Sequence, residues 1–348
     1  MKLFKKLAAI YSGSGDEEPM RQYIKRWIRS SVHGVEIVED EFGNLYVTKG
    51  VSETYPCVVA HLDQVQKPYP ADYKVLESSD IIMGYSPSSR KRHGLGADDK
   101  CGIWIALKML KKHEAIKVAF FPGEEVGCIG SSRANMEFFD DVRFVIEPDR
   151  RGAHDLITSI GFMDICSQEF IEAIQPEQFG YTAAQGMMTD VEVLKENGLS
   201  VSCINLSCGY YSPHTEDEYI VKKDLINACE FVDSIITNCV ETYPHISKLD
   251  DWYGDSYYSG YSRAKKKEDI DFDKWDEEFS EAYEYLAAEM EADPNIKARD
   301  FLSSYSGCFK YLDVKDVEDL ISDIKYEMSH SRYDYSDDYW KQQIDKDK

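Results

Sequence analysis

Three continuous apolar runs constrain the fold of this chain more than any other feature. They read "YPCVVAHLD", "IKVAFFPGEE" and "VRFVIEPD", and each of them ends in acidic side chains. A continuous apolar run of this length indicates a strand buried on both faces, as in a parallel sheet covered by helices. The sequence therefore favours an α/β protein with these three strands at the centre of its sheet.

Helical patterns alternate with these runs. "EPMRQYIKRWIRSS" has apolar residues on one helical face, "IWIALKML" indicates a buried helix from about residue 99, and "KKDLINACEFVDSIITNCVETY" indicates another helix. The spacing of Ser14 and Glu17 predicts a capping box before the first of these helices. "VEIVEDEFGNLYVTKG" predicts two strands joined by a turn at Gly43-Asn44. Strands that alternate with helices in this way predict an α/β/α sandwich.

The composition limits the partners and the compartment. A formal net charge of −24 argues against nucleic acid and against an anionic membrane surface, because both would repel the chain. No apolar run is long enough to span a bilayer, and the stretch from Leu7 to Tyr11 is too short for a signal peptide. Nine cysteines without regular spacing argue against a disulfide framework. We therefore expect a reducing compartment, the cytoplasm.

The character of the sequence changes near Ser247. The next stretch, "KLDDWYGDSYYSGYSRAKKKED", is polar and rich in tyrosine, which is typical of a linker. Beyond it, apolar and aromatic residues recur at helical spacing in "FDKWDEEFSEAYEYLAAEMEAD" and "VKDVEDLISDIKYEM". We predict a first domain over residues 1–246, a linker over 247–268, and a small acidic helical appendage over 269–348 that frays after Ser329.

Acidic side chains and histidines gather where the predicted strands end. "GLGADDKCG" places two adjacent acids where the chain enters an apolar helix, and a carboxylate that points into a core needs a cation. In an open α/β sheet, ligand-binding groups lie outside the carboxyl ends of the strands. Several carboxylates together with two histidines indicate a divalent metal ion. The residues at such positions are His61, Asp63, Asp98, Asp99, Glu124, Glu125, Asp149 and His214.

The short motifs around these residues resemble those of a known family. "HLD", "GADDK", "GEEVGCIGS", "EPD" and "PHTEDE" are similar, in this order, to the motifs of the co-catalytic dizinc exopeptidases. The similarity is greatest to peptidase T-like enzymes and zinc aminopeptidases, and it covers roughly residues 5–242. The resemblance implies a three-layer α/β/α catalytic domain with a mixed central sheet, of the zinc exopeptidase type. It also implies a hydrolase that acts on peptide bonds.

The resemblance implies a specific set of metal ligands. His61 and Asp149 would bind a first zinc ion, and Glu125 and His214 would bind a second. Asp98 would bridge the two ions with one oxygen to each. Each ion would then have three protein ligands and room for a shared water, as in catalytic zinc sites. Cobalt or manganese are the substitutes that this ligand set allows.

The resemblance also assigns two residues that do not bind metal. Glu124 would be the general base, which takes a proton from the water and returns it to the leaving amine. Asp63 would hold the far ring nitrogen of His61 and so fix its tautomer.

Simpler roles compete with some of these assignments. The adjacent glutamates could form an exposed acidic turn, and Asp63 could cap a turn. For Asp99 we favour a structural role, with Lys100 as a partner, over metal binding. Glu147 competes with Asp149 because both point the same way from a strand, and we prefer Asp149 because it ends the strand.

Two departures from the family bear on the substrate. Asp149 and His214 are too close in sequence for the inserted lid domain of peptidase T, so we expect no such domain. "GMMTDVEVL" resembles a family loop that normally carries an arginine, but Met187 and Met188 occupy that place. Without that arginine, the acidic surroundings favour a substrate ammonium group over a carboxylate.

The sequence therefore predicts a dizinc aminopeptidase that cleaves short peptides, and it leaves the oligomeric state open. One alternative is an N-acyl amino acid deacylase (an amidohydrolase) with the same chemistry. Another alternative is a metal-bearing interaction scaffold, against which the retained Glu124 argues because a scaffold needs no general base.

Overall fold

The computed structural model of the chain describes residues 1–161, 163–247 and 295–305, together with several single positions in the C-terminal part. These positions are residues 282, 286, 290, 312, 314, 315, 317, 318, 320, 321, 324 and 325. The chain divides into two compact units, Met1–Leu249 and Asp250–Lys348. Each unit is described by itself.

The first unit is built on a nine-stranded sheet in the order β1-β2-β7-β3-β8-β12-β9-β10, with β11 paired to β9. The strands β7, β3, β8 and β12 run parallel, whereas β1, β2 and β9 pair with their inner neighbours in the antiparallel sense. The bounds are β1 Val35–Glu39, β2 Leu45–Lys49, β3 Tyr55–His61, β7 Ile116–Phe121, β8 Val142–Arg150, β9 Asp155–Ile160, β10 Met163–Asp164, β11 Thr182–Gly186 and β12 Cys203–Ser207.

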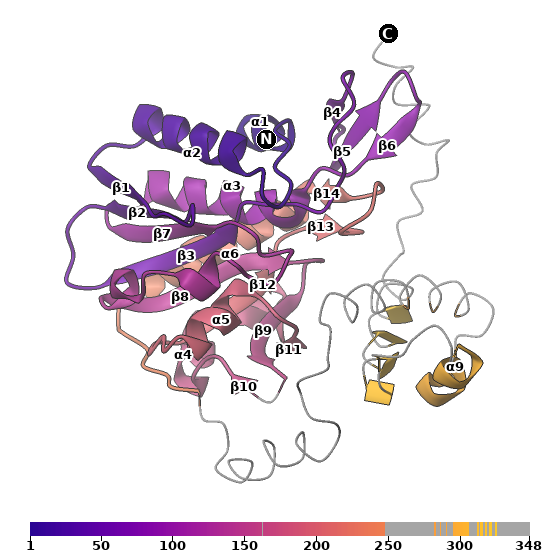
Figure 1. Cartoon of the computed structure of the whole chain (residues 1–348). Helices are drawn as coiled ribbons and strands as arrows, with labels where there is room; N and C mark the ends of the chain where they lie inside the picture. Colours follow the sequence, from indigo (N-terminus) through magenta and orange to yellow (C-terminus); the bar gives the residue numbers. More distant parts are fainter. Residues whose placement is uncertain are drawn as a thin grey trace. The chain divides into compact units, whose positions relative to one another are not determined.

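Both faces of the central strands are buried, which explains their continuous apolar sequence. In β3, Val58 and Ala60 join one apolar cluster, whereas Cys57 and Val59 join the other. Figure 1 shows α1, α2 and α3 on one side of the sheet and α5 on the other. The predicted α/β/α sandwich with a mixed sheet is thus confirmed. The helices are α1 Lys2–Ala8, α2 Glu18–Ser31, α3 Ala97–Lys112, α4 Gln168–Ile174, α5 Asp190–Glu196 and α6 Lys222–Asn238, and the 3₁₀ turns are η1 Ser131–Arg133, η2 Met136–Phe139 and η3 Pro176–Phe179.

A small second sheet, which the sequence did not predict, joins segments that are far apart in the chain. Its order is β13-β14-β5-β4, with β6 paired to β5. The bounds are β4 Lys74–Glu77, β5 Ile81–Ser86, β6 Lys91–His93, β13 Tyr210–Tyr211 and β14 Tyr219–Val221. The described residues between Asp149 and His214 all belong to the first unit, as expected for a chain without an inserted lid domain.

The predicted capping box before α2 is wrong. The helix begins at Glu18, and no side chain caps its first turn. Ser14 instead donates its hydroxyl to Oδ2 of Asp63 at 2.7 Å, while Glu17 accepts from the backbone N–H of Gly15 at 2.8 Å. The Ser14 hydroxyl therefore bonds to the buried carboxylate of Asp63, which is distant in sequence, and does not cap the helix as the local pattern predicted.

Most of the described residues in the second unit are helical, as predicted for the appendage. It includes α9 (Ala298–Ser304), and Ala282, Leu286 and Met290 are buried helical positions at four-residue spacing. These residues belong to an apolar cluster that extends to Ile324. The predicted linker beyond residue 247 and the tail after Ser329 lie outside the described residues. No helix in the described part of the chain is long and apolar enough to cross a membrane.

Candidate metal centre

The predicted metal ligands come together at the carboxyl ends of the parallel strands. β3 ends in His61, β8 carries Asp149 next to its last residue, and Glu124 and Glu125 follow β7 after a short turn. Asp98 lies in the first turn of α3. His214 enters from the loop between β13 and β14, so the small sheet positions this residue.

His61, Asp98 and Asp149 form the first cluster. The Nε2 atom of His61 lies 3.0 Å from Oδ1 of Asp98 and 3.5 Å from Oδ1 of Asp149. The ligand atoms of all three residues lie within 4.8 Å of one another, and the His61 side chain is fully buried. This spacing suits three donors around one ion.

Asp98, Glu125 and His214 form the second cluster. The Nε2 atom of His214 lies 3.0 Å from Oε2 of Glu125 and 3.4 Å from Oδ2 of Asp98. Asp98 thus offers one carboxylate oxygen to each cluster. His214 adopts a left-handed backbone conformation with φ of 61°, which is uncommon for a residue other than glycine.

Asp63 lies behind the first cluster and ties it to the glutamate pair. Its Oδ1 atom lies 3.4 Å from Nδ1 of His61, the ring nitrogen that faces away from Asp98. The same carboxylate accepts the backbone N–H groups of Glu124 at 3.0 Å and Glu125 at 3.3 Å. Asp63 therefore lies beside the far ring nitrogen of His61 and holds the turn that carries both glutamates.

Glu124 lies beside the first cluster. Its Oε2 atom is 4.0 Å from Nε2 of His61, and its Oε1 atom accepts a weak hydrogen bond from the thiol of Cys128 at 3.9 Å. Burial raises the pKa of Glu124 well above its ordinary value, and the carboxylates of Asp149 and Glu125 raise it further, although His61 acts in the opposite direction. Glu124 thus places a carboxyl group with a raised pKa beside the first cluster.

The charges of the two clusters depend strongly on one another. Although burial opposes it, hydrogen bonds from His214 and His61 hold the pKa of Asp98 far below its ordinary value. Burial raises the pKa of Asp149, and the Asp98 carboxylate raises it further. Burial favours neutral His61, but the neighbouring carboxylates outweigh burial and raise its pKa.

The donor set fits divalent metal ions. Oδ1 of Asp149 and Oε1 of Glu125 are buried and have no hydrogen-bond partner among the described residues, so both oxygens could coordinate an ion. Imidazole nitrogens and carboxylate oxygens are suitable ligands for zinc, and also for cobalt or manganese. Three donors in each cluster leave a coordination position open, which distinguishes a catalytic site from a closed structural one.

Asp99 lies outside both clusters. Its Oδ1 atom accepts the backbone N–H of Gly102 at 2.7 Å, within the first turns of α3. Lys100, which we expected as its partner, instead donates its ammonium group to the Tyr69 hydroxyl at 2.8 Å and to the Leu95 carbonyl at 2.7 Å. The expected partnership with Lys100 is therefore wrong, whereas the structural role of Asp99 agrees with its contacts.

Glu147 also lies outside both clusters. Its Oε2 atom accepts from the hydroxyl of Thr189 and from the backbone N–H of Val191 at 3.3 Å. Glu147 thereby binds the start of α5 to β8. Asp149, two residues further along the strand, has the position that reaches His61.

Sequence reasoning missed the role of Glu218, the last residue of the "PHTEDE" motif. This side chain is fully buried, and Oε2 accepts the backbone N–H of Leu95 at 2.7 Å. Oε1 accepts the backbone N–H of Asp98 at 3.2 Å. Glu218 therefore joins the segment that carries His214 to the segment that carries Asp98. Its place in the motif was the only signal in the sequence.

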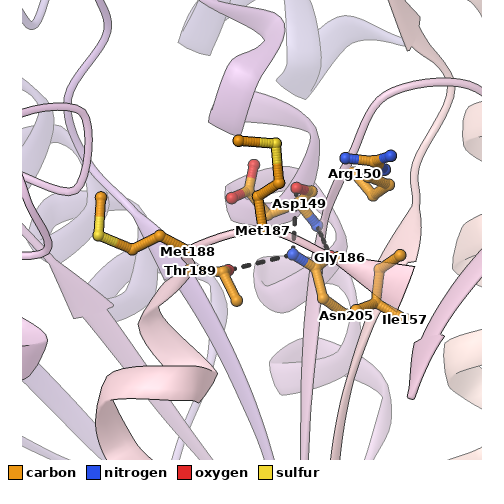
Figure 2. A pocket seen from close by; sticks show the side chains of 8 residues that line it. All are labelled: Asp149, Arg150, Ile157, Gly186, Met187, Met188, Thr189 and Asn205. Carbon is orange, nitrogen blue, oxygen red and sulfur yellow. Dashed lines mark hydrogen bonds between the residues drawn. The ribbon is translucent and has the colours of Figure 1, made fainter. Parts of the chain in front are cut away.

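A hollow adjoins Asp149 at the same edge of the sheet. Asn205 supports it: Nδ2 donates to Oγ1 of Thr189 at 3.1 Å and to the Asp149 carbonyl at 3.3 Å, and Oδ1 accepts the Asp149 N–H at 3.1 Å. Figure 2 shows these bonds beneath Met187. The residues that line the hollow are Asp149, Arg150, Ile157, Gly186, Met187, Met188, Thr189 and Asn205.

Comparison by sequence gives no relative. No model of a known protein family matches the chain, and a search of curated proteins finds no match.

Comparison by structure gives several peptidases. Aminopeptidase PepT from Bacillus cereus superposes with a TM-score of 0.53 at 16% identity, over 69% of this chain and 98% of that one. A tripeptidase from Staphylococcus aureus gives 0.54 at 17% identity, over 68% and 96%. The TET1 peptidase of Pyrococcus horikoshii gives 0.52 at 15% identity, over 68% and 98%. These identities are low, so the similarity is one of fold: the first unit of this chain has the fold of these peptidases.

Proposed function

We propose that this protein is a two-metal exopeptidase that removes single residues from the amino terminus of short peptides. The observation that carries the proposal is the pair of donor clusters that share Asp98, with Glu124 beside them. A shared carboxylate between two sets of three donors is the arrangement that a co-catalytic pair of ions requires. The fold similarity to an aminopeptidase and a tripeptidase supports peptides as the substrate class.

The residues that would hold the ions are those of the two clusters. His61 and Asp149 would bind one ion, Glu125 and His214 the other, and Asp98 both. When bound, two zinc ions would polarise the peptide carbonyl and lower the pKa of a water molecule.

Glu124 would move the proton in this reaction. Its carboxylate would accept a proton from the attacking water and deliver it to the nitrogen of the leaving amine. Asp63 would keep His61 in the tautomer whose Nε2 atom faces the cluster. Because Asp63 also holds the N–H groups of the glutamate turn, it would keep Glu124 at a fixed distance from His61.

Charge supports action at the amino terminus. The chain carries a net charge of −24, and most of this charge lies outside the carboxylates that would neutralise bound ions. Arg150 is the cation that lines the hollow, and its Nε atom lies 3.4 Å from Oδ2 of Asp155, which offsets its charge. This field favours a substrate ammonium group over a carboxylate.

Two measurements test this proposal. Elemental analysis of metal-replete protein should give two divalent ions per chain, and chelation should abolish cleavage of a short peptide. Of two peptides with one sequence, the C-amidated one should be cut and the N-acetylated one spared. If the protein holds no more than a trace of metal, the proposed metal centre is wrong. If only the acetylated peptide is cut, the enzyme acts at the carboxyl terminus and not at the amino terminus.

Arg150 favours a second candidate, a deacylase that acts on N-acyl amino acids. Its guanidinium group lies at the hollow beside Asp149, where it could hold the carboxylate of such a substrate. Release of the free amino acid from N-acetylated amino acids, without cleavage of peptides, would favour this reaction.

We also propose that the protein works in the cytoplasm. All eight cysteines within the described residues are free thiols, and most of them are buried. Free buried thiols are typical of a reducing compartment.

A further inference from the structure

The hollow beside Asp149 carries two exposed methionines on its rim. Met187 and Met188 lie between β11 and α5, and their exposed fractions are 47% and 61%. Figure 2 shows Met187 rising beside Asp149, whereas Met188 extends away from Arg150. Long apolar side chains in a concave site next to polar reacting groups are typical of ligand pockets.

The polar groups that line this hollow are already bonded within the protein. The Asn205 amide bonds to the backbone of Asp149 and to the hydroxyl of Thr189. That hydroxyl donates in turn to the buried carboxylate of Glu147. Apart from the metal ligand Asp149 and the ion-paired Arg150, the lining therefore offers a ligand few free hydrogen-bonding groups.

The inner wall of the hollow is apolar and tightly formed. Ile157 on β9 lies against Gly186 at the end of β11. A Cβ atom at Gly186 would lie 2.5 Å from Cγ2 of Ile157, so only glycine allows the two strands to lie this close here. Ile157 and the two methionines together give the hollow an apolar surface.

We propose that this hollow receives the side chain of the residue at the amino terminus of the substrate and selects long apolar side chains, such as those of leucine and methionine. The inference rests on the proposed aminopeptidase function. The hollow adjoins Asp149, so a side chain within it belongs to a residue held at the metal centre. Methionine side chains are unbranched and polarisable, so they adapt to apolar groups of different shape.

A peptide series tests the selection. Tripeptides X-Ala-Ala, with X as leucine, methionine, alanine, lysine or glutamate, are compared by kcat/KM on the full-length, zinc-loaded protein. Leucine and methionine should exceed alanine by about tenfold or more, the scale at which apolar pockets discriminate. Equal kcat/KM values across the series would overturn the inference. A preference for glutamate would also overturn it, because it would show that Arg150 binds the substrate side chain in the hollow.

A binding measurement tests the same inference without turnover. Calorimetry compares L-leucine hydroxamate with L-alanine hydroxamate on the zinc-loaded protein, where the hydroxamate occupies the metal centre and the side chain probes the hollow. The leucine compound should bind about tenfold or more tightly. If no tripeptide is cut but the leucine compound still binds about tenfold more tightly, the proposed aminopeptidase function is wrong and the selectivity of the hollow is supported. If the two compounds bind equally well, the inferred selectivity of the hollow is wrong.

Two variants test whether the methionines are responsible for the selection of apolar side chains. The double variant Met187→Ser/Met188→Ser should reduce the leucine-to-alanine ratio by at least about fivefold in both measurements. The control Val240→Ser alters an apolar side chain that is 63% exposed and does not line the hollow, so it should leave both ratios unchanged. An unchanged ratio in a double variant with the thermal stability of the parent protein would overturn the inference.

Discussion

At the scale of single residues, the glutamate pair shows how one turn can serve two roles. Asp63 accepts the backbone N–H groups of both Glu124 and Glu125, so the turn is fixed from behind. The two side chains then diverge: Glu125 reaches His214, whereas Glu124 lies beside His61. The two glutamates have the same side chain, so their different neighbours decide which is the proposed base and which is the proposed ligand.

This divergence predicts different losses for the same substitution. Glu124→Gln removes proton transfer but no proposed ligand, so both metal ions should remain while kcat falls by about 10²–10⁴-fold. Glu125→Gln removes a proposed ligand, so the protein should retain one ion per chain. Metal content and kcat are measured on both variants under the same metal-replete conditions. A Glu124→Gln protein that keeps most of its activity would contradict the role of the base.

The sequence indicated most of the candidate site residues because they lie next to strongly patterned elements, whereas His214 was indicated by its motif. His61, Glu124 and Asp149 lie at the ends of apolar runs that could be recognised without the structure. Ser14 and Glu218 had no such signal, because their partners lie far along the chain. A side chain whose contacts are all distant in sequence cannot be placed by local periodicity.

At the scale of elements, length and burial decided what could be predicted. β3 and β7 are buried throughout, and α3 is buried except at Lys108, Lys111 and Lys112, so their composition alone indicates them. β6 and β14 are only three residues long, too short to show a period, and β14 pairs with the distant β5. The small sheet therefore depends on tertiary pairing, and with it the position of the loop that carries His214.

Glu218 is a buried contact between this loop and the start of α3, so substituting it tests how the two elements are held together. Glu218→Gln replaces one acceptor oxygen with a donor that faces a backbone N–H. The free energy of unfolding of the metal-free protein should fall by about 1–3 kcal/mol, because buried hydrogen-bonding groups lose their partners. Metal affinity should also fall, because the Asp98 backbone loses its anchor.

The neighbouring Glu216 provides the matched control for this substitution. Its side chain is 50% exposed, pairs with His93 at 3.1 Å and accepts the backbone N–H of Gly94 at 3.3 Å. Glu216→Gln should lower the free energy of unfolding by less than Glu218→Gln does, because water can replace the lost partner at an exposed side chain but not at a buried one. Urea denaturation and metal titration of the two variants make the comparison. Equal effects at both positions would refute the anchoring role of Glu218.

At the scale of the whole molecule, the apolar clusters follow the division into two units. The two large clusters on either side of the sheet contain described residues only from the first unit. The third cluster runs from Ala282 to Ile324 and lies within the second unit. Both proposed metal clusters and the hollow beside Asp149 also lie within the first unit. The residues that carry the proposed chemistry thus all belong to one compact unit.

This distribution predicts that the first unit folds without the second. A chain ended after Leu249 should unfold in one cooperative transition and should bind the same number of metal ions as the full chain, because it keeps both large clusters and all proposed ligands. Circular dichroism during thermal unfolding, together with elemental analysis, makes the measurement, with the full chain as control. A truncated chain that stays unfolded with metal present would show that the second unit covers core surface of the first. In that case the acidic appendage would belong to the catalytic fold and would not be a separate addition to it.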